Sequence, residues 1–247
     1  MALASPVTKR RPLWTAVCRA GASEPAGTPP NKSYCGTSGE GNLRVLLIVG
    51  SWHFILSNIL SRRGLLRHPL KVRVPKTLAQ QFKAIGYEPK DVTYLGLSHM
   101  HFDHIGNVGL FPASTLLMQD EEYEAAFGPD SAKYGNDPAS YPTLKANPVT
   151  RLSGDHDVFG DGSVVIKRTA GHTPGHQSLF LKLPKTGNIL LSGDLAHFSK
   201  NWKHRRVPSF NFDKEMSVKA MDDMAKFIKD NKATLWIQHD LEQNAKM

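Results

Sequence analysis

Cysteine is scarce in this sequence, and uninterrupted apolar runs are short. Only two cysteines occur among 247 residues, Cys18 and Cys35. A disulfide framework is therefore excluded, and free thiols in a reducing compartment are favoured. The most apolar stretch, residues 43–60, is interrupted by Gly50, Ser51 and His53. It predicts a buried pair of strands rather than a membrane helix, so we expect no membrane association and a cytoplasmic location.

Acidic residues are absent before Glu24. Residues 1–42 are rich in alanine, serine, proline, glycine and basic residues, which predicts a disordered tail and leaves a targeting function of this basic segment open. A secretory signal is disfavoured because Pro6 and residues 9–11 break the apolar run near the start. We expect the folded domain to span residues 43–247.

The chain carries a formal net charge of +9. Such a charge suits nucleic acid or an anionic surface as a partner. Much of the excess falls in the first 76 residues, however, and the sequence contains no RNA-binding motif of interleaved aromatic and basic residues. We therefore expect no nucleic-acid partner.

Strand-like and helix-like segments alternate along the rest of the chain. Apolar, β-branched segments predict strands at residues 92–97, 115–118, 164–168, 178–183, 189–192 and 234–237. Amphipathic or capped segments predict helices at residues 75–86, 120–127 and 216–227. Residues 128–148 form a long loop rich in proline, glycine and asparagine, of the kind that often serves as a lid. The alternation predicts a layered α/β protein.

Polar residues that can bind a metal follow several of these strands. His99, His101, Asp103 and His104 fall within six positions, directly after the strand predicted at residues 92–97. Further candidates follow later strands or lie in turns between them: His172, His176, Asp194, His197 and His239. Imidazole and carboxylate together suit zinc, and also iron, manganese or cobalt.

The order of these motifs resembles the metallo-β-lactamase superfamily. The motifs are His99-x-His101-x-Asp103-His104, Gly171-His172-Thr173-Pro174-Gly175-His176, Ser192-Gly193-Asp194 and a strand-end His239. The resemblance implies a four-layer αβ/βα sandwich and two divalent metal ions, with zinc favoured. It implies that His99, His101 and His172 bind the first ion, that Asp103, His104 and His239 bind the second, and that Asp194 bridges both. His176 is expected to support the site rather than to bind metal.

Within the superfamily, the quorum-quenching N-acyl-homoserine lactone lactonases are the most similar group. The resemblance lies in residues 99–107, 171–180 and 201–213. It implies that a metal-bridging hydroxide opens the lactone ring and that Asp103 passes a proton to the leaving group. Glyoxalase II shares the motifs, but only eight residues follow His239, so we expect no C-terminal helical domain of its kind.

Two other activities stay open. One is β-lactam hydrolysis, alone or beside lactone hydrolysis, although no cysteine stands at the bridging position of the thiolate-bearing β-lactamases. The other is hydrolysis of a nucleic acid, which only the positive charge favours. The expected partner is a small lactone or lactam, and a homodimer is an open assembly state.

The sequence departs from the lactonase pattern in two places. His197 stands where these enzymes have a tyrosine that orients the lactone carbonyl, and we expect its imidazole to take over this catalytic hydrogen bond. The family usually begins with two or three strands that contain an Asp-Thr-Gly-like turn, and residues 1–70 show no such element, so the completeness of the first sheet is an open question. The residues expected to line the substrate pocket are Met100, Phe102, Phe198 and Trp202.

Overall fold

The computed structural model describes residues 15–19, 45–49, 77–84 and 87–244. Its first sheet has the strand order β1-β2-β3-β4-β5. The strands are β1 (Thr15–Arg19), β2 (Val45–Val49), β3 (Tyr94–Gly96), β4 (Thr115–Gln119) and β5 (Val149–Leu152). β1 pairs antiparallel with β2, and the other neighbours are parallel.

The second sheet has the order β10-β9-β8-β7-β6. Its strands are β6 (His156–Asp157), β7 (Val164–Arg168), β8 (Gln177–Leu183), β9 (Gly187–Leu191) and β10 (Thr234–Trp236). The pairs β6–β7, β7–β8 and β8–β9 are antiparallel, and β10 is parallel to β9. The residues between β5 and β6 carry the chain from one sheet to the other.

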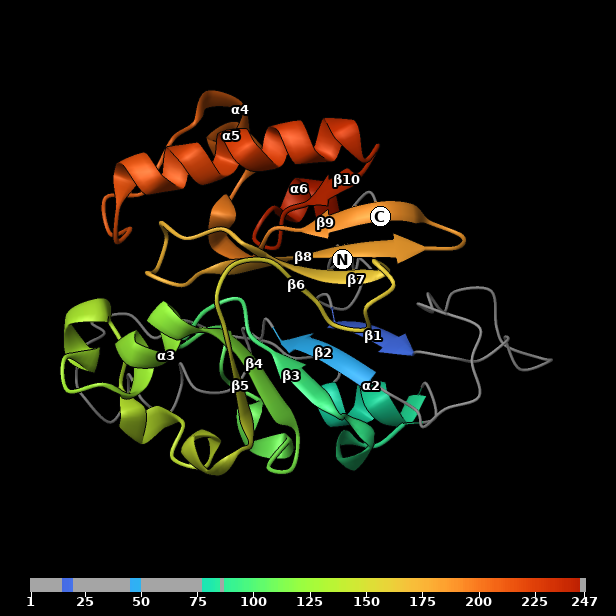
Figure 1. The fold of residues 1–247 in the computed structure, drawn as a ribbon, viewed down its shortest axis with the longest axis vertical. Coiled ribbons are helices and arrows are strands. Elements are labelled where there is room, and N and C mark those ends of the chain that lie inside the picture. Colours follow the sequence, from blue (N-terminus) through green and yellow to red (C-terminus); the bar gives the residue numbers. More distant parts are fainter. Residues whose placement is uncertain (1–14, 20–44, 50–76, 85–86, 245–247) are drawn as a thin grey trace, which may run out of the picture.

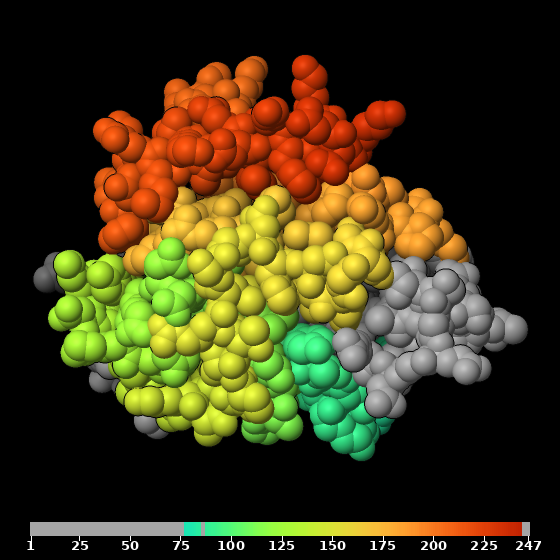
Figure 2. Space-filling view, viewed as in Figure 1, coloured from blue at the N-terminus to red at the C-terminus, as the bar shows by residue number. Residues whose placement is uncertain are grey.

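Helices cover the outer face of each sheet (Figure 1). On the first sheet lie α2 (Leu78–Ala84) and α3 (Asp120–Phe127); beyond the second lie α4 (Ser199–His204) and α5 (Lys214–Asp230), and α6 (Leu241–Asn244) follows β10. In the space-filling view, α4 and α5 form a continuous cap over the second sheet (Figure 2). The predicted four-layer αβ/βα sandwich is confirmed.

Strands β4 and β8 are buried on both faces, which explains their nearly continuous hydrophobic sequences. Successive side chains point to opposite faces of a strand. On β4, Leu116 therefore packs in the core beneath α2 and α3, whereas Leu117 packs between the sheets. On β8, Leu179 lies between the sheets and Phe180 faces the α5 residue Met221.

Two segments differ from the expectations. Residues 128–148 are not an open lid, because they form short 3₁₀ turns that pack on the body of the protein. Tyr141 and Leu144 are fully buried there, and the Tyr141 hydroxyl donates to the Ala126 carbonyl at 2.8 Å. Within the predicted tail, Thr15–Arg19 is strand β1, and the rest of that range lies outside the described residues.

The apolar segment predicted as a strand pair contains β2, and its continuation beyond Val49 lies outside the described residues. In the part of the chain that the structure describes, no helix has the length and apolar character needed to cross a membrane.

The packing predicts the cost of one core substitution. Leu117 is 2% exposed between the two sheets, so Leu117→Ala should lower the free energy of unfolding by about 2–5 kcal/mol. Leu110 is 38% exposed, and Leu110→Ala should cost about 1 kcal/mol or less. Denaturant titration of both variants measures the difference. Equal losses would contradict a packed core between the sheets.

Candidate metal centre

The candidate ligands meet at one edge of the two sheets. The loop after β3 carries residues 99–104, the turn between β7 and β8 carries His172, and Asp194 and His239 follow β9 and β10. Gln177 joins the sheets beneath this edge, because its side-chain amide donates to the carbonyls of Leu97 at 2.8 Å and Leu117 at 3.0 Å. The sheets therefore hold the ligand loops at a fixed separation.

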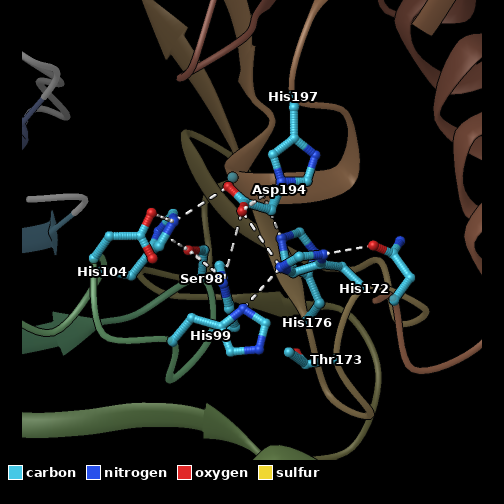
Figure 3. A network of polar contacts seen from close by, with 12 residues as sticks. Ser98, His99, His104, His172, Thr173, His176, Asp194 and His197 are labelled. Carbon is cyan, nitrogen blue, oxygen red and sulfur yellow. Dashed lines mark hydrogen bonds and ion pairs between the residues drawn. The ribbon is translucent and has the colours of Figure 1, made fainter. Parts of the chain in front are cut away.

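The carboxylate of Asp194 lies at the centre of the cluster (Figure 3). Its Oδ1 faces Nε2 of His239 at 2.9 Å and Nε2 of His104 at 3.2 Å. Its Oδ2 faces the Nε2 atoms of three other imidazoles, His197 at 3.1 Å, His172 at 3.3 Å and His99 at 3.9 Å. The two oxygens thus divide the surrounding imidazoles into two sets.

The same division appears among the groups that could hold an ion. His99, His101 and His172 bring their ligand atoms within 4.8 Å of one another, and we term them the first ligand group. Asp103, His104 and His239 do the same and form the second ligand group. All seven metal ligands expected from the sequence therefore come together. Asp194 also groups with His99 and His104, one from each ligand group, and with His172 and His197, which adds His197 to the candidates.

The donor atoms of the cluster are arranged to bind a cation rather than to form hydrogen bonds with one another. Nε2 of His99 is buried without a hydrogen-bond partner, and so is Nε2 of His104, which lies near Asp194 outside hydrogen-bond geometry. Nδ1 of His101 lies 3.0 Å from Nε2 of His172. Buried polar nitrogens are rarely left unpaired, and sets of imidazole and carboxylate donors suit divalent metals. The residues present therefore fit the ions expected from the sequence.

Hydrogen bonds on the far side of the imidazoles fix their orientation. Ser98 Oγ lies between Nδ1 of His99 at 3.2 Å and Nδ1 of His104 at 3.1 Å. Asn211 Oδ1 lies 3.0 Å from Nδ1 of His172. Partners of this kind hold the ring and leave Nε2 free for a metal. The sequence pattern identified neither Ser98 nor Asn211, because a hydroxyl or amide in a loop carries no distinctive signal.

His176 supports the turn that carries Asp194. Its Nε2 accepts a hydrogen bond from the Asp194 backbone at 2.9 Å, and its Nδ1 lies 2.9 Å from Thr169 Oγ1. Gly193 has a φ of +53°, and a Cβ there would lie 2.8 Å from both Nε2 of His176 and Cβ of Ser98. Only glycine fits this close approach. Both nitrogens of His176 are engaged away from the two ligand groups.

Burial keeps most of the imidazoles neutral. It lowers the pKa of His99 well below the usual value, lowers that of His101, and takes the pKa of His172 to about 2. Burial opposes protonation of His104 too and is the largest single effect, but Asp194 and the charges of Asp103 and Glu122 together outweigh it and raise the His104 pKa. Burial likewise opposes ionisation of Asp194, yet His104 and the hydrogen bonds from neighbouring imidazoles hold its pKa well below the usual value.

The expected pocket residues separate into two kinds. Phe102 and Phe198 are 49% and 52% exposed, near the cluster. Met100 is only 1% exposed and packs in the core beneath α2 and α3, because it points away from its neighbours His99 and His101. Trp202 packs against the core under α5, and the Arg205 guanidinium lies 4.8 Å from its ring. Met100 therefore does not line the site, whereas the role of the partly buried Trp202 stays a prediction.

Phe210 adds an aromatic side chain that the sequence pattern did not identify. It is 65% exposed, and its ring lies 5.9 Å from that of His172 and 5.8 Å from that of His197. The only signal in the sequence is that Phe210 lies within residues 201–213, one of the segments that resemble the lactonases.

Comparison with known proteins places this site in a family. A model described as the metallo-beta-lactamase superfamily matches residues 68–227. The chain belongs to the metallo-β-lactamase superfamily. An N-acyl homoserine lactonase AttM of Rhizobium radiobacter is 36% identical over 164 residues, which are 65% of this chain and 62% of that protein. An N-acyl homoserine lactonase of a Bacillus species is 35% identical over 161 residues, 65% of this chain and 61% of that protein.

The matched part of the chain thus spans less than two thirds of these relatives. Among solved structures, an N-acyl homoserine lactone hydrolase with the product N-hexanoyl-L-homoserine at its catalytic metal centre superposes with a TM-score of 0.68 and 28% identity. That superposition covers 85% of this chain and 81% of the other.

The pKa shifts predict that, as the pH falls, the second ligand group loses its ability to bind a metal ion before the first ligand group does. A protonated imidazole cannot bind metal. His104 has a raised pKa and protonates early as the pH falls, whereas the first ligand group contains His99 and His172, whose pKa values are lowered. A cation held by the second group would therefore be lost at a higher pH than one held by the first group. Metal content after dialysis at stepwise lower pH measures this, with far-ultraviolet circular dichroism to exclude unfolding. Earlier loss from the first group would contradict it.

Proposed function

We propose that this protein is a metal-dependent hydrolase that opens the lactone ring of N-acyl-homoserine lactones. The observation that carries the proposal is the Asp194 carboxylate, each oxygen of which faces a separate set of imidazole nitrogens at the edge of the two sheets. The similarity of the chain to named N-acyl homoserine lactonases supports the proposal as well. Two ions are proposed, one at each ligand group, with Asp194 between them. Zinc suits the donor set best.

Divalent ions at such a site supply a water of lowered pKa and polarise a carbonyl oxygen. The protein must then hold the ester and move protons. Ring opening adds water to the carbonyl carbon and breaks the bond to the ring oxygen, which leaves as an alkoxide and takes up a proton. Asp103 is suited to hold that proton, because its side chain is 12% exposed, compared with 4% for Asp194. With one carboxylate oxygen holding a metal, Asp103 would have the other free to carry the proton.

His197 is proposed to donate a hydrogen bond to the carbonyl oxygen of the lactone. Its side chain is 16% exposed, and its Nε2 faces the cluster beside Asp194 Oδ2. Its ring stacks on that of His239 with an interplanar angle of 16° and a centroid distance of 5.3 Å, which fixes its direction. An imidazole held in this way can offer an N–H to a developing oxyanion.

The exposed aromatics around the cluster are proposed to contact the acyl chain. Phe102, Phe198 and Phe210 are each about half exposed or more, although large apolar side chains are usually buried. Phe198 and Phe210 both lie near His197, with ring centroids at 6.4 Å and 5.8 Å. An apolar tail attached to the lactone would cover these rings while the ester carbonyl reaches His197.

A substrate comparison tests the activity. Lactone opening releases a proton, which a pH indicator detects, and β-lactam opening changes ultraviolet absorbance. We expect N-acyl-homoserine lactones to be hydrolysed faster than β-lactams. Asp194→Asn should abolish most of the activity, because loss of an outer partner of a metal ligand already costs about 10- to 100-fold. Faster β-lactam opening, or full activity of Asp194→Asn, would contradict the proposal.

Substitution of His197 tests its role separately. We expect His197→Phe to lower kcat for lactones by about 100-fold, as loss of one oxyanion donor does, with metal content unchanged. His197→Tyr retains a donor and should keep more activity than His197→Phe. His204→Phe serves as the control, because His204 is exposed at the end of α4. Loss of metal from His197→Phe would instead make His197 a ligand.

A further inference from the structure

Glu122 is a buried carboxylate in the first turn of α3, outside both ligand groups. It is 1% exposed, whereas the side chain of its neighbour Glu121 is 45% exposed and pairs with Arg168. Among the described residues, no lysine or arginine forms an ion pair with Glu122. A buried carboxylate costs free energy unless hydrogen bonds replace its water. The position of Glu122 therefore needs an explanation beyond the stability of α3.

The two oxygens of Glu122 bind two different ligand loops. Oε1 accepts a hydrogen bond from the Met100 backbone at 3.0 Å. Oε2 accepts one from the Thr173 hydroxyl at 2.6 Å and one from the Gly175 backbone at 3.0 Å. Met100 stands between His99 and His101, and Thr173 follows His172. One carboxylate thus joins the two loops that carry the whole first ligand group.

Close packing fixes this connection. A Cβ on Gly175 would lie 2.4 Å from the Glu122 nitrogen and 2.7 Å from its Cβ. The loop after His172 is therefore pressed against the start of α3, and a larger residue at position 175 would push it away. Burial raises the pKa of Glu122, and the hydrogen bonds from Thr173, Gly175 and Met100 oppose that rise.

We propose that Glu122 is a positioning residue that sets the separation of these two loops and thereby the geometry of the first ligand group. The proposal rests on the proposed metal-dependent function, since it assigns Glu122 a role in holding the ion. Glutamate is required because all three of its partners donate. A glutamine would turn its NH₂ group toward at least one N–H or O–H donor, and one of the two loops would lose its connection.

Cobalt binding provides a readout that does not depend on the substrate. We expect Glu122→Gln to weaken cobalt binding at the first ligand group by about 10- to 100-fold, the range for outer partners of metal ligands. The visible absorption spectrum of the bound cobalt should change as well. Glu121→Gln removes the same charge from the same helical turn but touches no ligand loop, and it should bind cobalt like the unmodified protein.

A second variant covers the case in which Glu122→Gln fails to fold. Thr173→Val removes only one of the three hydrogen bonds, and it should weaken cobalt binding in the same direction by a smaller factor. Unchanged affinity and spectrum in a folded Glu122→Gln variant would overturn the proposal, as would unchanged binding in Thr173→Val. If both variants weaken cobalt binding as expected but the unmodified protein hydrolyses no lactone, the proposed function is overturned and the positioning role of Glu122 stands.

Discussion

The attraction between one buried carboxylate and the imidazoles around it is the interaction on which this site depends. Asp194 is 4% exposed, and five imidazole nitrogens lie within 3.9 Å of its two oxygens. A buried carboxylate needs positive charge or many donors nearby. The surrounding residues meet this need: Ser98 and Asn211 turn the imidazoles inward, and His176 holds the backbone of Asp194 in place.

The precision of that arrangement comes from the two sheets. Each candidate ligand follows a strand that packs against a hydrophobic core, so the cores fix the points from which the loops depart. Gln177 then ties the second sheet to carbonyls of the first directly below the loops. Rigid elements with their functional groups on short loops are a general way to hold a metal site.

The sequence predicted the elements best where an apolar run ended in polar residues. The helix Asp120–Phe127 and the strand Val164–Arg168 have the predicted bounds. The predicted strand ends also gave the positions of the candidate ligands, because the bounds of an element and the polar residues after it both depend on local sequence pattern. Glu122 could not be assigned a role in this way, since its partners are distant in the chain. Met100 was misplaced because adjacent residues in the loop point in opposite directions, and the motif alone does not say which one faces the site.

The order of the ligands along the chain has a consequence for how the protein is made. His99, His101, Asp103 and His104 precede the crossing between the sheets, whereas His172, Asp194 and His239 follow it. Each ligand group combines residues from both parts, and His239 follows the last strand. During synthesis, neither group is complete until the second sheet has docked on the first. Tight capture of an ion would thus mark the end of folding, and an unfinished chain would offer only a weak, exchangeable site.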